Sequence, residues 1–168
     1  MSRHVAIASM ALWSVCVIGT ATAQSPAAAS TREIDRDIWA FLVATVANDD
    51  IIGMGRAYFP EAVLVMPSAT LPIKVALEGW GRDMVAARAK GARATVELRF
   101  SRRQDDSTTA FEVGIFKYTV ISKDGVRTPA YFPFEELLVK TNGKWRVLME
   151  HQFPAVTQEE WNKLPQGG

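Results

Sequence analysis

The most constraining feature of this sequence is a two-residue periodicity that runs through its second half. From Ala94 to Phe100, apolar residues alternate with polar ones, as in a strand with one buried face. Three more long strands are predicted at Phe111–Ile121, Arg127–Lys140 and Gly143–Phe153. The connections between them are short, and Asn142-Gly143 is a strong hairpin signal. The pattern predicts four antiparallel strands arranged as a meander.

The first half of the chain has helical spacing instead. Ser30-Thr31-Arg32-Glu33 has the capping-box pattern and predicts a helix to about Ala47. Two further helices are predicted, one after Asn48-Asp49-Asp50 through Tyr58 and one from about Leu77 to Lys90. The remaining predicted elements are a strand at Ala62–Met66, a loop at Ser68–Lys74, a polar turn at Arg102–Thr108 and a tail helix after a capping box at Thr157–Glu160. Because helices and strands are segregated along the chain, the predicted fold class is α+β.

The first 23 residues are arranged like a secretory signal peptide. Arg3 supplies the positive start, Val5–Ile18 the apolar region, and Ala21-Thr22-Ala23 a small-residue cleavage site. The apolar run is shorter than the roughly 20 residues that cross a bilayer, although a retained anchor is the alternative. We therefore expect residues 1–23 to be removed and the protein to be exported, either periplasmic or secreted. Residues 24–30 are predicted to be a flexible leader, 31–153 the domain and 154–168 a tail.

Charge and composition exclude several classes of function for the chain that remains after this cleavage. Basic and acidic residues are then equal in number, which gives no electrostatic reason to expect nucleic acid or a membrane surface as partner. Cys16, the single cysteine, lies in the removed segment, and His151 is the only remaining histidine. A cysteine-based metal site, a multi-histidine zinc site and a disulfide are therefore excluded. We expect no metal and no cofactor.

Several motifs, in this order, resemble one known superfamily. They are Tyr58–Val65, Glu78–Met84, Phe111–Gly114 and Gly143–Val147, after an opening helix. Together the sequence resembles the SnoaL-like members of the nuclear transport factor 2-like superfamily, which includes ketosteroid isomerase. The resemblance covers about residues 32 to 153. It implies a cone-shaped, curved antiparallel sheet wrapped by about three N-terminal helices, a pocket between them, and a homodimer formed through the outer face of the sheet.

His151 is the first candidate for chemistry. Strict alternation places it on one strand face with Trp145, Val147 and Met149, an apolar face that would point to the helices and hence to the implied pocket. An imidazole titrates near neutral pH, which suits a general acid or base. The alternative is a structural histidine that hydrogen-bonds to a backbone carbonyl at the end of the strand.

Glu112 and Tyr118 share a strand face with Gly114 and Phe116. If this face lines the pocket, the two could act with His151 as an acid/base and hydrogen-bonding group. The opposite face is at least as apolar, so Glu112 could equally be solvated or lie in a dimer interface. Adjacent strand residues point to opposite sides, so at most one of Glu135 and Glu136 faces inward. Arg99, Arg102 and Arg103, followed by Asp105 and Asp106, are typical of a solvated turn.

Five further residues are candidates for the pocket wall: Tyr58, Met66, Trp80, Asp83 and Met149. For the apolar ones the alternative is ordinary core packing, and for Asp83 it is a favourable interaction with a helix N-terminus. The sequence thus predicts an exported domain that holds a small, mainly apolar or amphipathic molecule. The predicted reaction, if there is one, is cofactor-free proton transfer, as in an isomerase, dehydratase or cyclase. A non-catalytic binding module and a dimerisation module are the alternatives.

Overall fold

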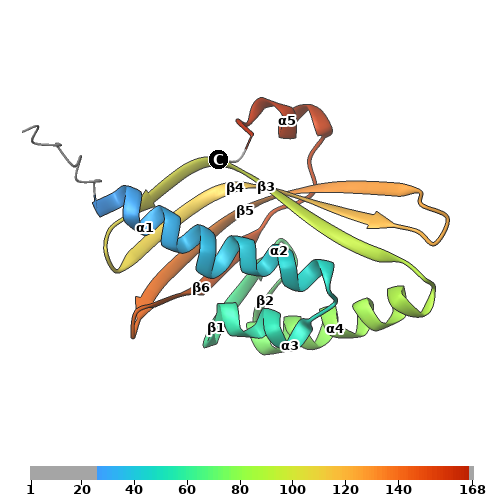
Figure 1. The fold of residues 1–168 in the computed structure, drawn as a ribbon, viewed down its shortest axis with the longest axis horizontal. Helices are drawn as coiled ribbons and strands as arrows, with labels where there is room; N and C mark the ends of the chain where they lie inside the picture. Colours follow the sequence, from blue (N-terminus) through green and yellow to red (C-terminus); the bar gives the residue numbers. More distant parts are fainter. Residues whose placement is uncertain (1–25, 167–168) are drawn as a thin grey trace, which may run out of the picture.

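The computed structural model of the protein describes residues 26–166 (Figure 1). The predicted signal peptide lies outside the described residues, and its removal remains a prediction. Thirteen elements follow in this order: α1 (Pro26–Ile34), the π-helix η1 (Asp35–Trp39), α2 (Ala40–Ala47), α3 (Ile51–Met54), the 3-10 helix η2 (Gly55–Ala57), β1 (Tyr58–Met66), β2 (Ala69–Pro72), α4 (Ile73–Ala89), β3 (Arg93–Asp105), β4 (Thr109–Ile121), β5 (Arg127–Thr141), β6 (Lys144–Gln152) and α5 (Gln158–Lys163).

The sheet has six strands in the order β2-β1-β6-β5-β4-β3. Strands β3 to β6 form the predicted antiparallel meander. The sheet as a whole is mixed, because β1 runs parallel to β6. The segment predicted as a loop at Ser68–Lys74 contains β2, which forms a hairpin with β1. The α+β fold class with N-terminal helices, a curved sheet and a short C-terminal helix is confirmed.

The helices cover the two faces of the sheet unequally. The long helical segment α1-η1-α2 crosses the inner face, and α4 contacts α3 and strands β1, β2 and β3 (Figure 1). The main core forms between these helices and the sheet, around Ile34, Ile38, Phe134 and Leu138. On the outer face, α5 packs Trp161 against Ile115 and Tyr131. None of the helices in residues 26–166 is long and apolar enough to cross a membrane.

Local signals in the sequence predicted several element ends correctly. Asn142 and Gly143 both have positive φ angles, 53° and 73°, as a two-residue hairpin turn requires. Thr157 and Glu160 form the predicted capping box at α5, and the Asp50 side chain caps α3. The first helix, however, begins at Pro26, so the Ser30–Glu33 pattern lies inside it and residues 26–30 of the predicted leader are helical.

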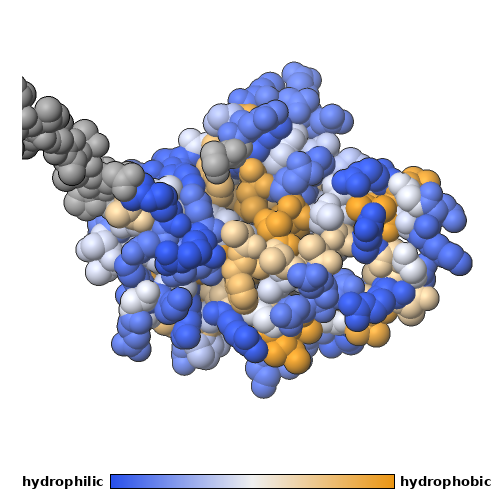
Figure 2. Space-filling model, viewed as in Figure 1, coloured by the Kyte–Doolittle hydropathy of each residue, from blue (hydrophilic) through white to orange (hydrophobic). Residues whose placement is uncertain are grey.

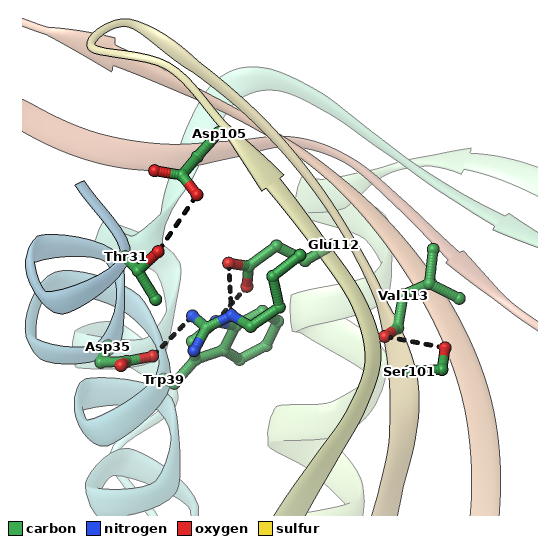
Figure 3. Close-up of polar contacts among 8 residues, drawn as sticks. Thr31, Asp35, Trp39, Ser101, Asp105, Glu112 and Val113 are labelled. Atoms are coloured by element: carbon green, nitrogen blue, oxygen red, sulfur yellow. Dashed lines mark hydrogen bonds and ion pairs between the residues drawn. The ribbon is translucent and has the colours of Figure 1, made fainter. Parts of the chain in front are cut away.

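Two β-bulges change which residues face the helices. In β3, Phe100 pairs with Gly114 and Arg102 with Val113, so Ser101 is an additional residue. Its hydroxyl donates a hydrogen bond to the Val113 carbonyl (3.2 Å, Figure 3). In β6, Met149 pairs with Leu137 and Val147 with Leu138, so Leu148 is additional. Beyond each extra residue, the side chains that strict alternation would point toward the helices point to the other face of the sheet, and the reverse.

The reversal in β3 corrects the prediction of a solvated turn at Arg102–Thr108. The strand continues to Asp105, and Arg103 lies opposite Glu112 rather than in solvent. The turn itself is shorter than predicted and is organised by Asp106, which accepts hydrogen bonds from the backbone amides of Thr108 and Thr109. These hydrogen bonds lower the pKa of Asp106 to about 2.

Candidate functional site

A cavity of about 480 Å³ lies between the inner face of the sheet and helices α2 and α4. This volume is within the usual range for small-molecule sites. Figure 2 shows hydrophobic residues gathered in the middle of the face that carries α2 and α4, with hydrophilic residues around them. Asp83 and Val120, both exposed, line the open end of the cavity.

The walls of the cavity are mainly apolar and aromatic. Seven aromatic side chains line it: Trp39, Tyr58, Trp80, Phe116, Tyr118, Phe132 and Phe134. Aliphatic side chains and methionines from α2, α3, α4 and β3 fill the spaces between them, among them Leu42, Met54, Met84 and Leu98. A ligand that fills this space must therefore bury mostly apolar surface.

The polar groups of the deep wall come from β5, β6 and the start of β1. Glu136 and Glu150 are cross-strand neighbours, and both are buried. Glu150 accepts hydrogen bonds from the Tyr58 hydroxyl (2.7 Å) and from the Gln152 side-chain amide (2.5 Å). Glu136 is 3% exposed, and its Oε2 atom has no hydrogen-bond partner among the described residues. Glu136 thus lines the apolar cavity, and one oxygen of its buried carboxyl lacks a donor among the described residues.

Burial controls the protonation of this pair. Removal from water, together with the neighbouring carboxyls of Glu150 and Glu112, raises the pKa of Glu136 well above its ordinary value. Burial also raises the pKa of Glu150, while the hydrogen bonds from Gln152 and Tyr58 act in the opposite direction. Two carboxylates so close together do not both ionise easily, which favours a state in which the pair keeps a proton.

Glu112 is the third member of a row of buried glutamates, since it pairs with Glu136 across β4 and β5. It does not line the cavity. Instead it accepts hydrogen bonds from Trp39 Nε1 (2.5 Å) and Arg103 Nε (2.8 Å), and Arg103 also donates to Asp35 (2.6 Å, Figure 3). Burial raises the pKa of Glu112, and the bonds from Arg103 and Trp39 oppose this effect. Glu112 is thus a satisfied structural carboxylate behind the pocket wall.

The open end of the cavity holds a second set of polar groups. Tyr118 lines it beside Asp83. Partial burial, with smaller contributions from the carboxylates of Asp49 and Asp83, raises the pKa of the Tyr118 phenol. Asp49 is engaged by Arg88 (3.0 Å), whereas Asp83 has no ion pair within residues 26–166. The mouth is therefore polar and acidic, and the walls behind it are apolar.

Comparison with known proteins identifies the architecture. No known family profile matches the sequence, and no curated protein matches it either. Solved structures do match. Aln2 from a Streptomyces species is 20% identical with a TM-score of 0.63, covering 77% of this chain and 91% of that one. The NTF2-like superfamily protein from Salmonella enterica serovar Typhimurium is 17% identical with a TM-score of 0.59, covering 78% and 94%.

A third match, an NTF2-like protein of unknown function from Shewanella oneidensis, is 12% identical with a TM-score of 0.61 and covers 74% of this chain and 99% of that one. The chain has the nuclear transport factor 2-like fold. The predicted resemblance at the level of the fold is thereby confirmed. Because these identities are low and the same fold carries many unrelated functions, the function has to be argued from the pocket itself.

Within this NTF2-like fold, four predicted pocket residues line the cavity: Tyr58, Trp80, Asp83 and Tyr118. Glu112 is on the same inner face as Tyr118, which resolves the question of the face, but its carboxylate is held by Arg103 and Trp39. Met66 packs against the main core outside the lining of the cavity. Whether the four lining residues contact a ligand stays a prediction.

His151 and Met149 do not line the cavity, contrary to the prediction from alternation. The bulge at Leu148 turns Glu150 and Gln152 inward and leaves Met149 and His151 on the other side of β6. There, His151 Nδ1 lies 3.5 Å from Glu135 Oε2, and its ring packs on Phe153 with centroids 4.0 Å apart. The role of His151 as the pocket's acid or base is therefore withdrawn.

Sequence reasoning missed Glu136, Glu150 and Gln152 as pocket residues. For Glu136 a signal exists in the sequence, because only one of Glu135 and Glu136 can face the core. Alternation places Glu136 on the same strand face as Phe132 and Phe134. Glu150 and Gln152 could not be found from alternation, since the bulge reverses it. In the described part of the chain, no group of three or more His, Cys, Asp or Glu side chains is arranged to hold a metal ion.

Proposed function

We propose that the protein binds a small, mainly apolar molecule in this pocket, with the polar part of the molecule at the Glu136–Glu150 pair. The observation that carries the proposal is the Glu136 carboxyl, which is buried at the deep wall of an aromatic cavity without a partner for its Oε2 among the described residues. A buried polar group of this kind costs stability of about 1–3 kcal/mol unless something satisfies it. A ligand that hydrogen-bonds to Glu136 would offset this cost.

A neutral fluorescent probe can test the proposal. The naphthyl ketone Prodan is apolar and its emission shifts to the blue in an apolar site, so we expect wild-type protein to produce a saturable blue shift. Ala87→Phe, which places a ring in the cavity from α4, should weaken binding at least about tenfold. Ala86→Phe is the matched control, because Ala86 is exposed on the same helix and does not line the cavity. No saturable shift, or equal loss in both variants, would refute the pocket.

Proton-transfer catalysis is a second candidate function, and one specific observation favours it. Two adjacent buried carboxyls whose pKa values are both raised can supply one acid and one base to the same ligand. Glu150 would take a proton from a carbon next to a carbonyl, while the protonated Glu136 would donate a hydrogen bond to the carbonyl oxygen. Return of the proton to the same carbon would complete an exchange, and in a ligand with a conjugated double bond its delivery to the γ carbon of the dienol would complete an isomerisation.

Exchange of hydrogen for deuterium separates this candidate from plain binding. Prodan has hydrogens on the carbon beside its carbonyl, and in heavy water a catalytic pair should exchange them faster than buffer alone. Glu150→Gln should abolish the exchange, whereas Glu135→Gln on the outer face should not. Saturable binding of Prodan with no exchange above buffer would favour the non-catalytic binding module.

A further inference from the structure

The charges that line the pocket all have the same sign. Three carboxyls line it, Asp83 from α4, Glu136 from β5 and Glu150 from β6. No lysine, arginine or histidine is among the described residues that line it. The partly buried guanidinium of Arg103 is engaged by Glu112 and Asp35 behind the wall. A ligand inside therefore meets acidic side chains and, among the described lining residues, no basic side chain that would compete for them.

The aromatic walls add to this preference. The faces of aromatic rings attract cations, and the attraction is strongest where water is excluded. Trp39 and Phe134 lie in contact, as do Phe116 and Phe132, with ring centroids 5.3 Å apart in each pair. Phe116 and Phe134 are also neighbours, with centroids 6.2 Å apart, so these four rings form one contiguous part of the wall. Carboxyls combined with aromatic rings and no competing base are the chemistry that recognises an organic cation.

At the deep wall, the carboxylate form of Glu136 would need a donor for its Oε2 atom that the described residues do not supply. Glu150 already accepts from Tyr58 and Gln152, whereas Glu136 Oε2 accepts from no described residue. We propose that the ligand is a lipophilic amine, which enters as an ammonium ion and donates hydrogen bonds to Glu136 and Glu150. This proposal rests on the pocket of the proposed function and names the class of molecule that it takes.

An ammonium ion and a neutral ligand would respond to pH in opposite directions. At the deep wall, Glu136 lies next to Glu150, which is bonded to Tyr58. Behind the wall lies Glu112 with Arg103. The other titratable groups of the cavity are Tyr118 and Asp83. Burial and the neighbouring carboxyls raise the pKa of Glu136 and so favour its protonated form in the free protein. An ammonium ion needs the carboxylate, so its binding releases a proton and strengthens as pH rises, by up to about tenfold per unit. A ligand that accepts a hydrogen bond from the protonated carboxyl binds more weakly as pH rises.

Two probes of nearly equal size separate these cases. Naphthylmethylamine is an ammonium ion at neutral pH, and naphthylmethanol is its neutral counterpart. By titration calorimetry at about pH 7.5, we expect the amine to bind the wild-type protein about tenfold more tightly than the alcohol. The amine's affinity should rise between about pH 5.5 and pH 7.5, and its binding heat in buffers of different ionisation enthalpy should show proton release.

Two adjacent glutamates provide the matched variants. Glu136→Gln should remove the preference for the amine, whereas Glu135→Gln, on the outer face, should keep it. Prodan binding by each variant reports that its pocket is still folded. If the Glu136→Gln variant does not fold, Glu136→Leu is used in its place. An alcohol that binds as tightly as the amine, or an amine that weakens as pH rises, would overturn the amine proposal alone. Failure of both probes and of Prodan would overturn the proposed function itself.

Discussion

Replacement of Arg103 by methionine is expected to destabilise the protein by about 3 kcal/mol, the lower end of the range for breaking a buried ion pair. The Glu112 carboxylate is fully buried, and Arg103 is its only cationic partner among the described residues. Without Arg103, Trp39 alone would satisfy Glu112, and a charge would remain in the core next to Glu136. The bond from Arg103 to Asp35 adds little to this figure, because the Asp35 side chain is 39% exposed. Urea unfolding monitored by tryptophan fluorescence measures the change.

A second substitution distinguishes this explanation from a general loss of packing. Arg103→Met combined with Glu112→Leu removes both charges, and we expect it to regain most of the lost stability. Lys163→Met is the surface control, since Lys163 and its partner Glu159 are both largely exposed, and it should change stability by no more than about 0.5 kcal/mol. A double variant as unstable as Arg103→Met would mean that the arginine acts through its packing on Phe100 rather than through Glu112.

The wild-type protein is expected to be less stable at about pH 8 than at about pH 5. The folded-state pKa values of Glu136 and Glu150 are raised, so the native state binds more protons than the unfolded chain between the unfolded value of 4.5 and the folded values. Their stabilising contribution is complete below that value and is lost as pH rises toward the folded pKa values. Each unit of upward shift corresponds to about 1.4 kcal/mol. Unfolding in urea across this pH range measures the slope.

The matched variants assign this slope to the pocket. Glu136→Leu removes the buried carboxyl and should reduce the slope. At about pH 8 it should also stabilise the protein by about 1–3 kcal/mol, since an apolar side chain has no desolvation cost there. Glu135→Gln should leave the slope intact. A wild-type stability that rises steadily from pH 5 to pH 8 would contradict the assignment.

The sequence predicts the fold well where local chemistry decides the structure. The two-residue hairpin at Asn142-Gly143, the capping box at Thr157 and the alternation through β3 and β4 each follow from short-range rules, and together they lead to the α+β class. Strand β2 was missed because Ala69–Pro72 is short and its pairing with β1 depends on tertiary packing rather than on periodicity.

The candidate site was harder to predict because it depends on two bulges. A single extra residue reverses which side chains face inward, and no composition signal marks Ser101 or Leu148 as that residue. One bulge brings Arg103 to Glu112, and the other exchanges His151 for Glu150 at the pocket wall. Glu150 and Gln152 can therefore be assigned to the pocket only from the register of β6 against β5.

The most direct test of this account is a titration of the Glu136 carboxyl by carbon-13 NMR, with the signal assigned by its loss in Glu136→Gln. We predict that Glu136 remains protonated at neutral pH in the free protein and that its signal changes when Prodan occupies the pocket. A Glu136 carboxyl that titrates near the ordinary value of 4.5 and does not respond to Prodan would contradict the account.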